Sequence, residues 1–349
     1  MLLEGIFLPL TTPFYPDGRL YLRKLEANVD RYSKTPAAGL LVCGRIGEPD
    51  ALTDAERLEV LETAIGAAAK EKVMIAGVGR ESVLATMLLT DAAAAVGYDA
   101  IAVKGPAFSA DMSMRAELLT YFRAVADRSP LAMVLVSTIE RPLAIEVIGE
   151  LAGHANVIGV IDDRVTEDRM TRLRENTARV SREVEVTNVF AAVTARMRKG
   201  TEGGGAGNFV SAASLGSGEA ALAVPAPRPA LKTRSKRVGF QVLAGSTGSM
   251  LPGWRWGATG AAPRLGACAP QACCEVWQAF KDGDLWLAEE KQMRVLAIGE
   301  RVEGWSGVAA IKHACDFNGY FGGRPRLPLI ALTAEQQAAL EREMAGLRN

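Results

Sequence analysis

Charged side chains follow several short apolar runs of this sequence. The run in "NVIGVIDDR" ends in Asp162 and Asp163, the run in "AIAVKG" ends in Lys104, and Arg45 follows the run in "GLLVCG". A lysine amine can attack a carbonyl carbon, a guanidinium can bind a carboxylate through two hydrogen bonds, and a carboxyl group can transfer protons. If the apolar runs are parallel strands, these side chains are expected at the same end of the sheet.

The apolar runs predict a barrel of parallel strands. They read "GIFLPLT", "GLLVCG", "VMIAGVG", "AIAVKG", "AMVLVS", "VIGVID", "GFQVLAG" and, more weakly, "ATGAAPRLGA". Their near-continuous hydrophobicity is typical of strands that are covered on both faces. Amphipathic helical stretches lie between them, and one begins at Thr53 with Glu56 as its capping-box partner. Eight such units predict an α/β protein with the (β/α)8 TIM barrel fold.

The barrel is expected over residues 1–268, followed by a C-terminal helical region over 269–349. An insertion at about 178–237 separates the sixth strand from the seventh. Its part from Gly200 to Arg237 is rich in Gly, Ala, Pro and Ser, which favours a loop excursion. The basic residues from Arg228 to Arg237 are interpreted as a solvated, charged loop, with anion binding as the weaker alternative.

Composition excludes several classes of function. Lys+Arg and Asp+Glu both number 40, so the net charge is zero and gives no reason to expect binding to nucleic acid or an anionic membrane. The N-terminus has no basic segment of a signal peptide, and we expect a cytoplasmic protein. The five cysteines match no zinc motif, and the two histidines, His154 and His313, are far apart. We therefore expect no metal, no cofactor and no Ser-His-Asp triad.

An ordered series of motifs resembles the dihydrodipicolinate synthase and N-acetylneuraminate lyase family. "LTTPFYPDGRL" is similar to the family's first strand and following turn, and "GLLVCGRIGEPDALTDAER" to its second strand, Gly-Thr-Thr-Gly-Glu loop and helix start. "VMIAGVG", "GYDAIAVKGPAF", "NVIGVIDD" and "GRPRLPLIALT" resemble the third, fourth and sixth strands and the C-terminal segment. The resemblance implies class I aldolase chemistry, in which a lysine on the sixth strand forms a Schiff base with a 2-oxo acid.

The residues at the family's reactive positions differ here. The lysine position is Ile161, the fifth-strand tyrosine position is Val136, the two loop threonines are Arg45 and Ile46, and the second fourth-strand aromatic is Phe108. The resemblance therefore predicts that the nucleophile and its proton relay are missing. The framework residues that match the family pattern are Gly44, Gly47, Glu48, Pro106, Asp162 and Arg141.

Three hypotheses follow. In the first, the chain does not form a Schiff base but binds a small 2-oxo acid or another carboxylate through Gly44, Arg45, Ile46, Gly47, Glu48 and Arg141. In the second, it is an active lyase with a relocated lysine, such as Lys104, helped by Ser137, Thr138 or Asp163. In the third, it is a non-catalytic subunit that pairs with an active homologue. The family usually forms dimers of dimers, so we expect a homodimer or homotetramer.

Each of these residues also has a structural interpretation. Arg45 could form a salt bridge with Glu48 or a neighbouring acid, and Lys104 could point to solvent at its strand end. The turn "GSTGS", Gly245 to Ser249, lies where barrels often bind phosphate, although its composition alone is a weak signal.

Overall fold

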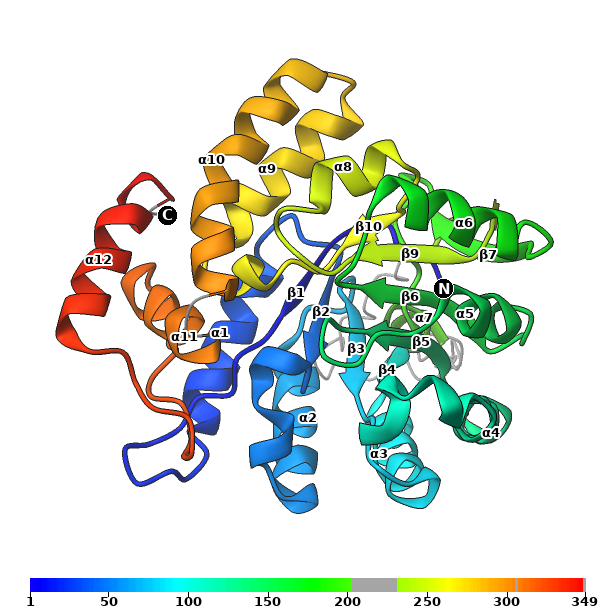
Figure 1. The fold of residues 1–349 in the computed structure, drawn as a ribbon, viewed down its shortest axis with the longest axis horizontal. Helices are drawn as coiled ribbons and strands as arrows, with labels where there is room; N and C mark the ends of the chain where they lie inside the picture. The colour runs from blue at the N-terminus through cyan, green and yellow to red at the C-terminus, as the bar shows by residue number, and fades with distance from the viewer. Residues whose placement is uncertain (203–230, 305–306, 348–349) are drawn as a thin grey trace, which may run out of the picture.

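Eight parallel strands close into a barrel, as the apolar runs predict (Figure 1). The structure, a computed structural model, describes residues 1–202, 231–304 and 307–347. In order around the barrel the strands are β1 (Gly5–Pro9), β2 (Gly39–Val42), β3 (Val73–Gly77), β4 (Ala100–Lys104), β5 (Ala132–Ser137), β6 (Val157–Asp162), β9 (Gln241–Ala244) and β10 (Gly260–Ala261). The (β/α)8 fold is therefore confirmed.

Helices surround the barrel because their apolar stripes pack on its outer face. They are α1 (Leu22–Ser33), α2 (Asp54–Ala67), α3 (Val83–Val96), α4 (Arg115–Arg128), α5 (Ile145–Ala152), α6 (Glu167–Thr177), α8 (Met250–Arg255) and α9 (Pro270–Lys281). The predicted capping box of α2 is present: the Thr53 side chain accepts from the Glu56 backbone N–H, and the Glu56 side chain accepts from that of Thr53. Such a cap satisfies two backbone donors that a helix start leaves free.

Side chains from alternate strand positions fill the barrel interior. Its buried apolar cluster comprises Leu3, Phe7, Leu41, Val73, Ile75, Ala100, Ala102, Val134, Ile158, Ile161, Leu243 and Ala262. The intervening strand positions join a larger cluster with the surrounding helices. This arrangement explains the near-continuous hydrophobicity of the strands, since both faces of the sheet are covered.

The described part of the insertion covers the N-terminal end of the barrel. It contains an antiparallel pair, β7 (Arg182–Thr187) and β8 (Thr233–Val238), together with α7 (Ala195–Glu202). Its hydrogen bonds go to residues that precede barrel strands: Arg182 to the carbonyls of Ala152 and His154, Thr194 to that of Lys70, and the Ala195 N–H to Asp99. The glycine cluster and Arg228 lie outside the described residues. The prediction of a charged loop up to Arg237 is wrong for its described part, because Arg234, Lys236 and Arg237 lie on β8 and pair with β7.

Further helices follow the barrel, as expected from the sequence. They are α10 (Leu285–Gly304), α11 (Val308–Phe317) and α12 (Ala334–Met344), which lie together beside α1 and α9 in Figure 1. Short 3-10 turns lie at η1 (Arg45–Gly47), η2 (Pro49–Ala51), η3 (Ala107–Ala110), η4 (Met112–Met114), η6 (Arg264–Ala267) and η7 (Ala345–Leu347). The division at residue 268 stays a prediction. Among the described helices, none is long and apolar enough to cross a bilayer.

Candidate functional site

A cavity of about 280 Å³ lies at the carboxyl ends of the barrel strands. Its wall contains Lys104, Val136 and Ile161, which are neighbours in the sheet: Lys104 pairs with Val136, and Val136 pairs with Ile161. In-register residues on parallel strands project to the same side, so this row faces the cavity from β4, β5 and β6. The active sites of TIM barrel enzymes lie at this end.

The cavity wall at the end of β6 is apolar. Ile161 is only 5% exposed and belongs to the barrel's interior cluster with Leu41 and Ala262, which also line the cavity. Val136, beside it on β5, packs against the same cluster. No group in either side chain can attack a carbonyl or carry a proton.

Lys104 lines the cavity but is held in an ion pair. Its Nζ lies 2.9 Å and 2.7 Å from the two carboxylate oxygens of Asp50, and its side chain is 24% exposed. Burial acts to raise the pKa of Asp50, but hydrogen bonds and charge from Lys104, with help from Arg57 and Arg141, lower it overall. The Lys104 amine is therefore engaged by the Asp50 carboxylate instead of being directed at a ligand carbonyl.

Arg45 reaches from η1 across the mouth of the barrel. Its guanidinium bonds to Glu140, which follows β5, and its Nη1 lies 3.4 Å from Oδ2 of Asp163, which follows β6. Arg45 therefore forms ion pairs with neighbouring acids, as its structural interpretation predicts, and these acids are Glu140 and Asp163 instead of Glu48. Arg45 also lines the cavity, so the ion pairs and a role in ligand binding are compatible.

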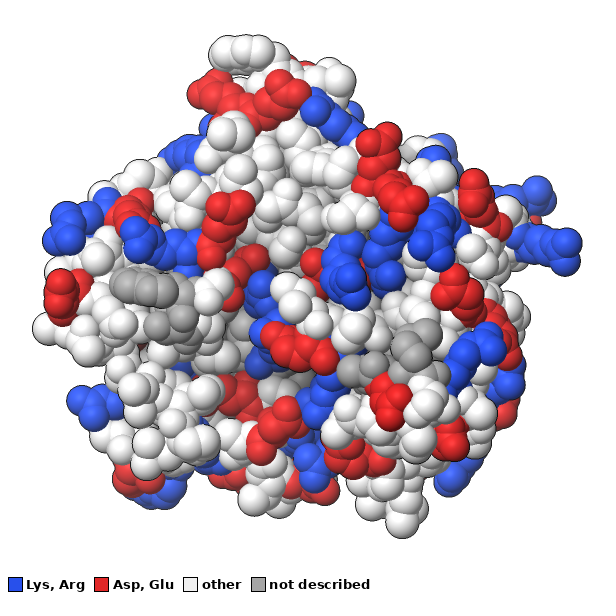
Figure 2. Space-filling model, in the orientation of Figure 1, with Lys and Arg blue, Asp and Glu red and all other residues white. Residues whose placement is uncertain are grey.

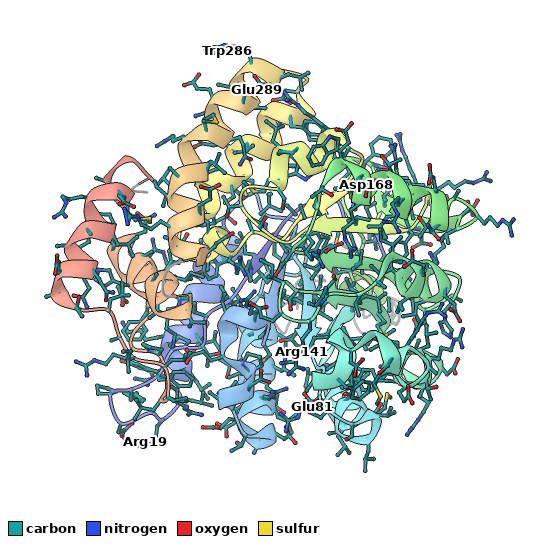
Figure 3. All side chains as sticks on the ribbon, in the orientation of Figure 1. Arg19, Glu81, Arg141, Asp168, Trp286 and Glu289 are labelled. Carbon is teal, nitrogen blue, oxygen red and sulfur yellow. The ribbon has the colours of Figure 1, made fainter. Side chains whose placement is uncertain are left out.

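Arg141 lies at the same mouth, where Figure 3 shows it close to Glu81. Its Nη1 donates to Glu81 Oε1 at 3.1 Å and to the Gly105 carbonyl at 3.0 Å. Arg141 lines the cavity, as do Gly44 and Ile46 of the loop after β2. Four of the six predicted substrate-binding residues are therefore brought together at one cavity. Figure 2 shows basic and acidic side chains intermixed over the middle of this face.

Gly47 and Glu48, the other two, are not among the residues that line the cavity. The Gly47 carbonyl accepts from Thr12 Oγ1 at 2.6 Å, and a side chain at Gly47 would approach the Leu10 carbonyl to 3.1 Å. Glu48 pairs with Lys312 of α11 at 2.5 Å, and the two side chains are 1% and 0% exposed. For both residues the structure gives a packing role, and ligand contact stays a prediction.

Asp162, Ser137 and Arg169 form a buried group behind the cavity wall. Arg169 Nε donates to the fully buried Asp162 carboxylate at 2.5 Å and Arg169 Nη2 donates to the Leu143 carbonyl at 2.9 Å. Ser137 Oγ accepts from the Leu143 N–H. These bonds fix α6 against β5 and β6, so neither Ser137 nor Asp162 is placed to transfer protons to a ligand.

Asp163 has a different environment from its neighbour. Its carboxyl is 9% exposed, lines the cavity, and lies near two guanidiniums: Arg45 at 3.4 Å and Arg264 of η6 at 3.8 Å. Burial raises the pKa of Asp163 to about 6, although the charges of Arg264 and Arg45 lower it, and the nearby Glu303 and Asp162 add to the rise. A carboxyl with this pKa can exist in either protonation state near neutral pH.

Two arginines in the cavity wall were not identified as site residues from the sequence. Arg57 of α2 is 1% exposed, bonds to the Pro49 carbonyl through Nε at 2.9 Å, and has an Nη1 without a partner among the described residues. The Nε of Arg264 likewise has no hydrogen-bond partner among the described residues. The signal for Arg264 was its position within the weak eighth apolar run, "ATGAAPRLGA". Arg57 had no such signal, because the sequence around it is that of a charged position on a helix.

The turn after β9 binds a carboxylate of the protein itself. Glu303 of α10 accepts from the Thr247 hydroxyl at 2.5 Å and from the Thr247 and Leu265 N–H groups at 3.2 Å. The weak phosphate-binding alternative for "GSTGS" is therefore not favoured, because an acidic side chain occupies these donors.

The described residues offer no group of three or more His, Cys, Asp or Glu side chains that could hold a metal ion. The five cysteines are free and buried, and burial raises the pKa of Cys43, which lies in the cavity wall, to about 12. A thiol with this pKa is a poor nucleophile at neutral pH.

Comparison with known proteins relates the whole chain to one family. The model of the dihydrodipicolinate synthetase family matches residues 2–214 and 229–346. A 4-hydroxy-tetrahydrodipicolinate synthase of an Exiguobacterium strain is 27% identical over 339 residues, covering 96% of this chain and 95% of the relative. One from Xanthomonas axonopodis pv. citri is 34% identical over 176 residues, which span 50% of this chain and 58% of the relative.

Solved structures share the fold. A dihydrodipicolinate synthase from Bacillus anthracis superposes with a TM-score of 0.77 at 20% identity, covering 99% of both chains. The prophage protein YagE from E. coli K12, solved in complex with pyruvate, gives a TM-score of 0.77 at 22% identity, also over 99% of both chains. Because the family model matches almost the full length of this chain, the chain belongs to the dihydrodipicolinate synthetase family.

Proposed function

We propose that this protein binds a small carboxylic acid at the barrel mouth and does not form the family's lysine Schiff base. The observation that carries the proposal is the apolar end of β6, where Ile161 faces the cavity in register with Val136. An imine requires a neutral primary amine within reach of the ligand's carbonyl carbon. An isoleucine at this position supplies none.

The basic residues of the cavity wall support the same proposal. Four of the five basic residues that line it are arginines, namely Arg45, Arg57, Arg141 and Arg264. A guanidinium stays protonated in proteins and forms no imine, but it binds carboxylates well. The fifth is Lys104, whose Nζ is engaged in an ion pair with Asp50.

The charge balance and size of the cavity favour a small anion. Its wall carries five basic side chains against three acidic ones, Asp50, Glu140 and Asp163. A volume of about 280 Å³ suits a molecule of a few carbon atoms better than a drug-sized one. Pyruvate is the first probe to test, because the related fold of YagE was solved with it.

Binding and imine formation are separated by two measurements on one protein. Isothermal titration calorimetry with pyruvate at pH 5 to 8 measures affinity, and borohydride treatment followed by intact-mass spectrometry detects an imine. We expect binding without a mass increase. A stable adduct would overturn the proposal, and peptide mapping would show whether Lys104 carries it.

A matched pair of variants locates the binding. Arg141→Met removes a cavity guanidinium and is expected to weaken pyruvate binding by about tenfold or more. Arg172→Met removes an exposed guanidinium that pairs with Glu146 and does not line the cavity, so affinity should be unchanged. Equal effects of the two substitutions, or no binding at any pH, would refute a carboxylate site at the mouth. Assembly into a homodimer or homotetramer stays a prediction that native mass spectrometry can test.

A further inference from the structure

Asp163 and Arg264 lie on opposite sides of a glycine-lined niche in the cavity wall. The Asp163 carboxyl follows β6 and packs against Gly245, where an added Cβ would lie 2.2 Å from Asp163 Oδ1. Arg264 begins η6 after β10, and its Nη1 is 3.8 Å from Asp163 Oδ2. Gly245 also lines the cavity, so the niche opens to a ligand. A side chain at position 245 would displace the Asp163 carboxyl from its observed place.

The guanidiniums near Asp163 do not fully neutralise it. Arg45 lies at 3.4 Å, beyond the usual length of a charge-assisted hydrogen bond, and also bonds to Glu140. Arg264 is farther, and its Nη2 faces Glu303 Oε2 at 3.5 Å. The charged groups that surround the Asp163 carboxyl from all sides are Arg45 of η1, Glu140 after β5, Asp162 of β6, Glu303 of α10 and Arg264 of η6.

Arg264 also brings an unused donor to the niche. Its side chain is 12% exposed, and its Nε–H has no hydrogen-bond partner among the described residues. A buried donor without a partner is costly, so a shift of the Arg264 side chain that lets a ligand oxygen accept from Nε–H would gain more than an exposed contact would. An oxyanion is the natural acceptor beside a guanidinium.

We propose that Asp163 and Arg264 form an oxyanion subsite, in which the neutral Asp163 carboxyl donates a hydrogen bond to a carboxylate ligand and binding takes up a proton. This inference rests on the proposed function. A charged Asp163 would repel the anion, whereas a neutral carboxyl offers an O–H donor beside the Arg264 guanidinium. Burial has already raised the pKa of Asp163 to about 6, so the proton is available at little cost near neutral pH.

The expected signature is a specific pH dependence of affinity. Pyruvate is itself ionised throughout pH 5 to 8, so its own charge does not change in this window. If only the protonated form of Asp163 binds, the association constant falls about tenfold per pH unit above the pKa. Calorimetry should show binding about 100-fold weaker at pH 8 than at pH 5. At pH 7, titrations in two buffers of different ionisation enthalpy should show uptake of close to one proton per pyruvate.

Three variants test the assignment. Asp163→Asn keeps an N–H donor but cannot titrate, so affinity should change less than about twofold from pH 5 to 8. Asp50→Asn is the matched control: it removes another cavity carboxylate, one paired with Lys104, and should keep the wild-type slope with pH. Arg264→Lys keeps the charge but loses the Nε–H donor, and should weaken binding about tenfold or more at pH 5.

The outcomes separate this inference from the proposed function. Pyruvate binding that is independent of pH in the wild type, or a slope that persists in Asp163→Asn, would overturn the oxyanion subsite and leave carboxylate binding intact. Absence of pyruvate binding at both pH 5 and pH 8 would overturn the proposed function and this inference with it. A pH slope that disappears only in Asp163→Asn supports the subsite.

Discussion

Replacing Lys312 by methionine tests whether Glu48 belongs to the framework or is free to bind a ligand. The Lys312 Nζ lies 2.5 Å from Glu48 Oε1, donates to the Arg324 carbonyl at 3.0 Å, and sits 4.3 Å from the centre of the Phe14 ring. Neither charged side chain is more than 1% exposed. Burial lowers the pKa of Lys312, and the negative charge of Glu48 opposes this effect.

The expected loss follows from an unpaired buried charge. Methionine keeps the volume of the lysine stem, so the main effect of Lys312→Met is to remove the partner of the Glu48 charge. Among the described residues, the Arg326 N–H, 2.7 Å away, then remains as the hydrogen-bond donor to this carboxylate. Breaking a buried pair from one side costs about 3 to 5 kcal/mol in the free energy of unfolding. Adding Glu48→Gln removes the stranded charge and should recover most of that loss.

Urea unfolding followed by circular dichroism measures these free energies. The control is Lys34→Met, which breaks an ion pair with Asp30 in which both side chains are more than half exposed, and should cost less than about 1 kcal/mol. If Lys312→Met cost no more than this control, Glu48 would not be held in a closed charge pair. The packing role given to Glu48 would then be wrong.

Three further predictions concern the cavity itself. The folded pKa of Asp163, about 6, lies above the ordinary 3.8, so wild-type stability should fall as pH rises from about 4 to 6. Relative to the wild type, Asp163→Asn should therefore gain about 2 kcal/mol in the free energy of unfolding between pH 4 and pH 7 in urea titrations. Parallel pH curves of the two proteins would contradict this. Lys104→Met removes the hydrogen bonds that lower the pKa of Asp50, so carboxyl NMR titration should show that pKa rising, whereas an unchanged value would deny the ion pair. Ile161→Lys places an amine in the apolar wall, and borohydride should then trap pyruvate at position 161; binding without an adduct would mean that the ligand carbonyl lies elsewhere.

The fold could be predicted because it depends on short apolar runs that repeat along the chain. Each run coincides with a barrel strand, and even the weak eighth run contains β10. The bounds of the insertion, about 178–237, stay a prediction, and its place at the N-terminal end of the barrel could not be predicted from the sequence. That place depends on long-range bonds such as those of Arg182 to the residues before β6.

The site was only partly predictable, for a physical reason. Strand ends indicate which residues can meet, and Lys104, Val136 and Ile161 do line one cavity. Sequence does not reveal which charges pair across the mouth, and the partners of Arg45 proved to be Glu140 and Asp163. Arg57 looked like any charged residue on a helix, although it is almost fully buried.

We expect that the protein forms no Schiff base with a 2-oxo acid. The direct measurement is borohydride trapping with pyruvate, read by intact-mass spectrometry, with Ile161→Lys treated in parallel as the positive control. We expect no mass increase for the wild-type chain under conditions in which calorimetry shows pyruvate bound and the variant is labelled. A stable adduct on a wild-type lysine, and on Lys104 above all, would contradict it.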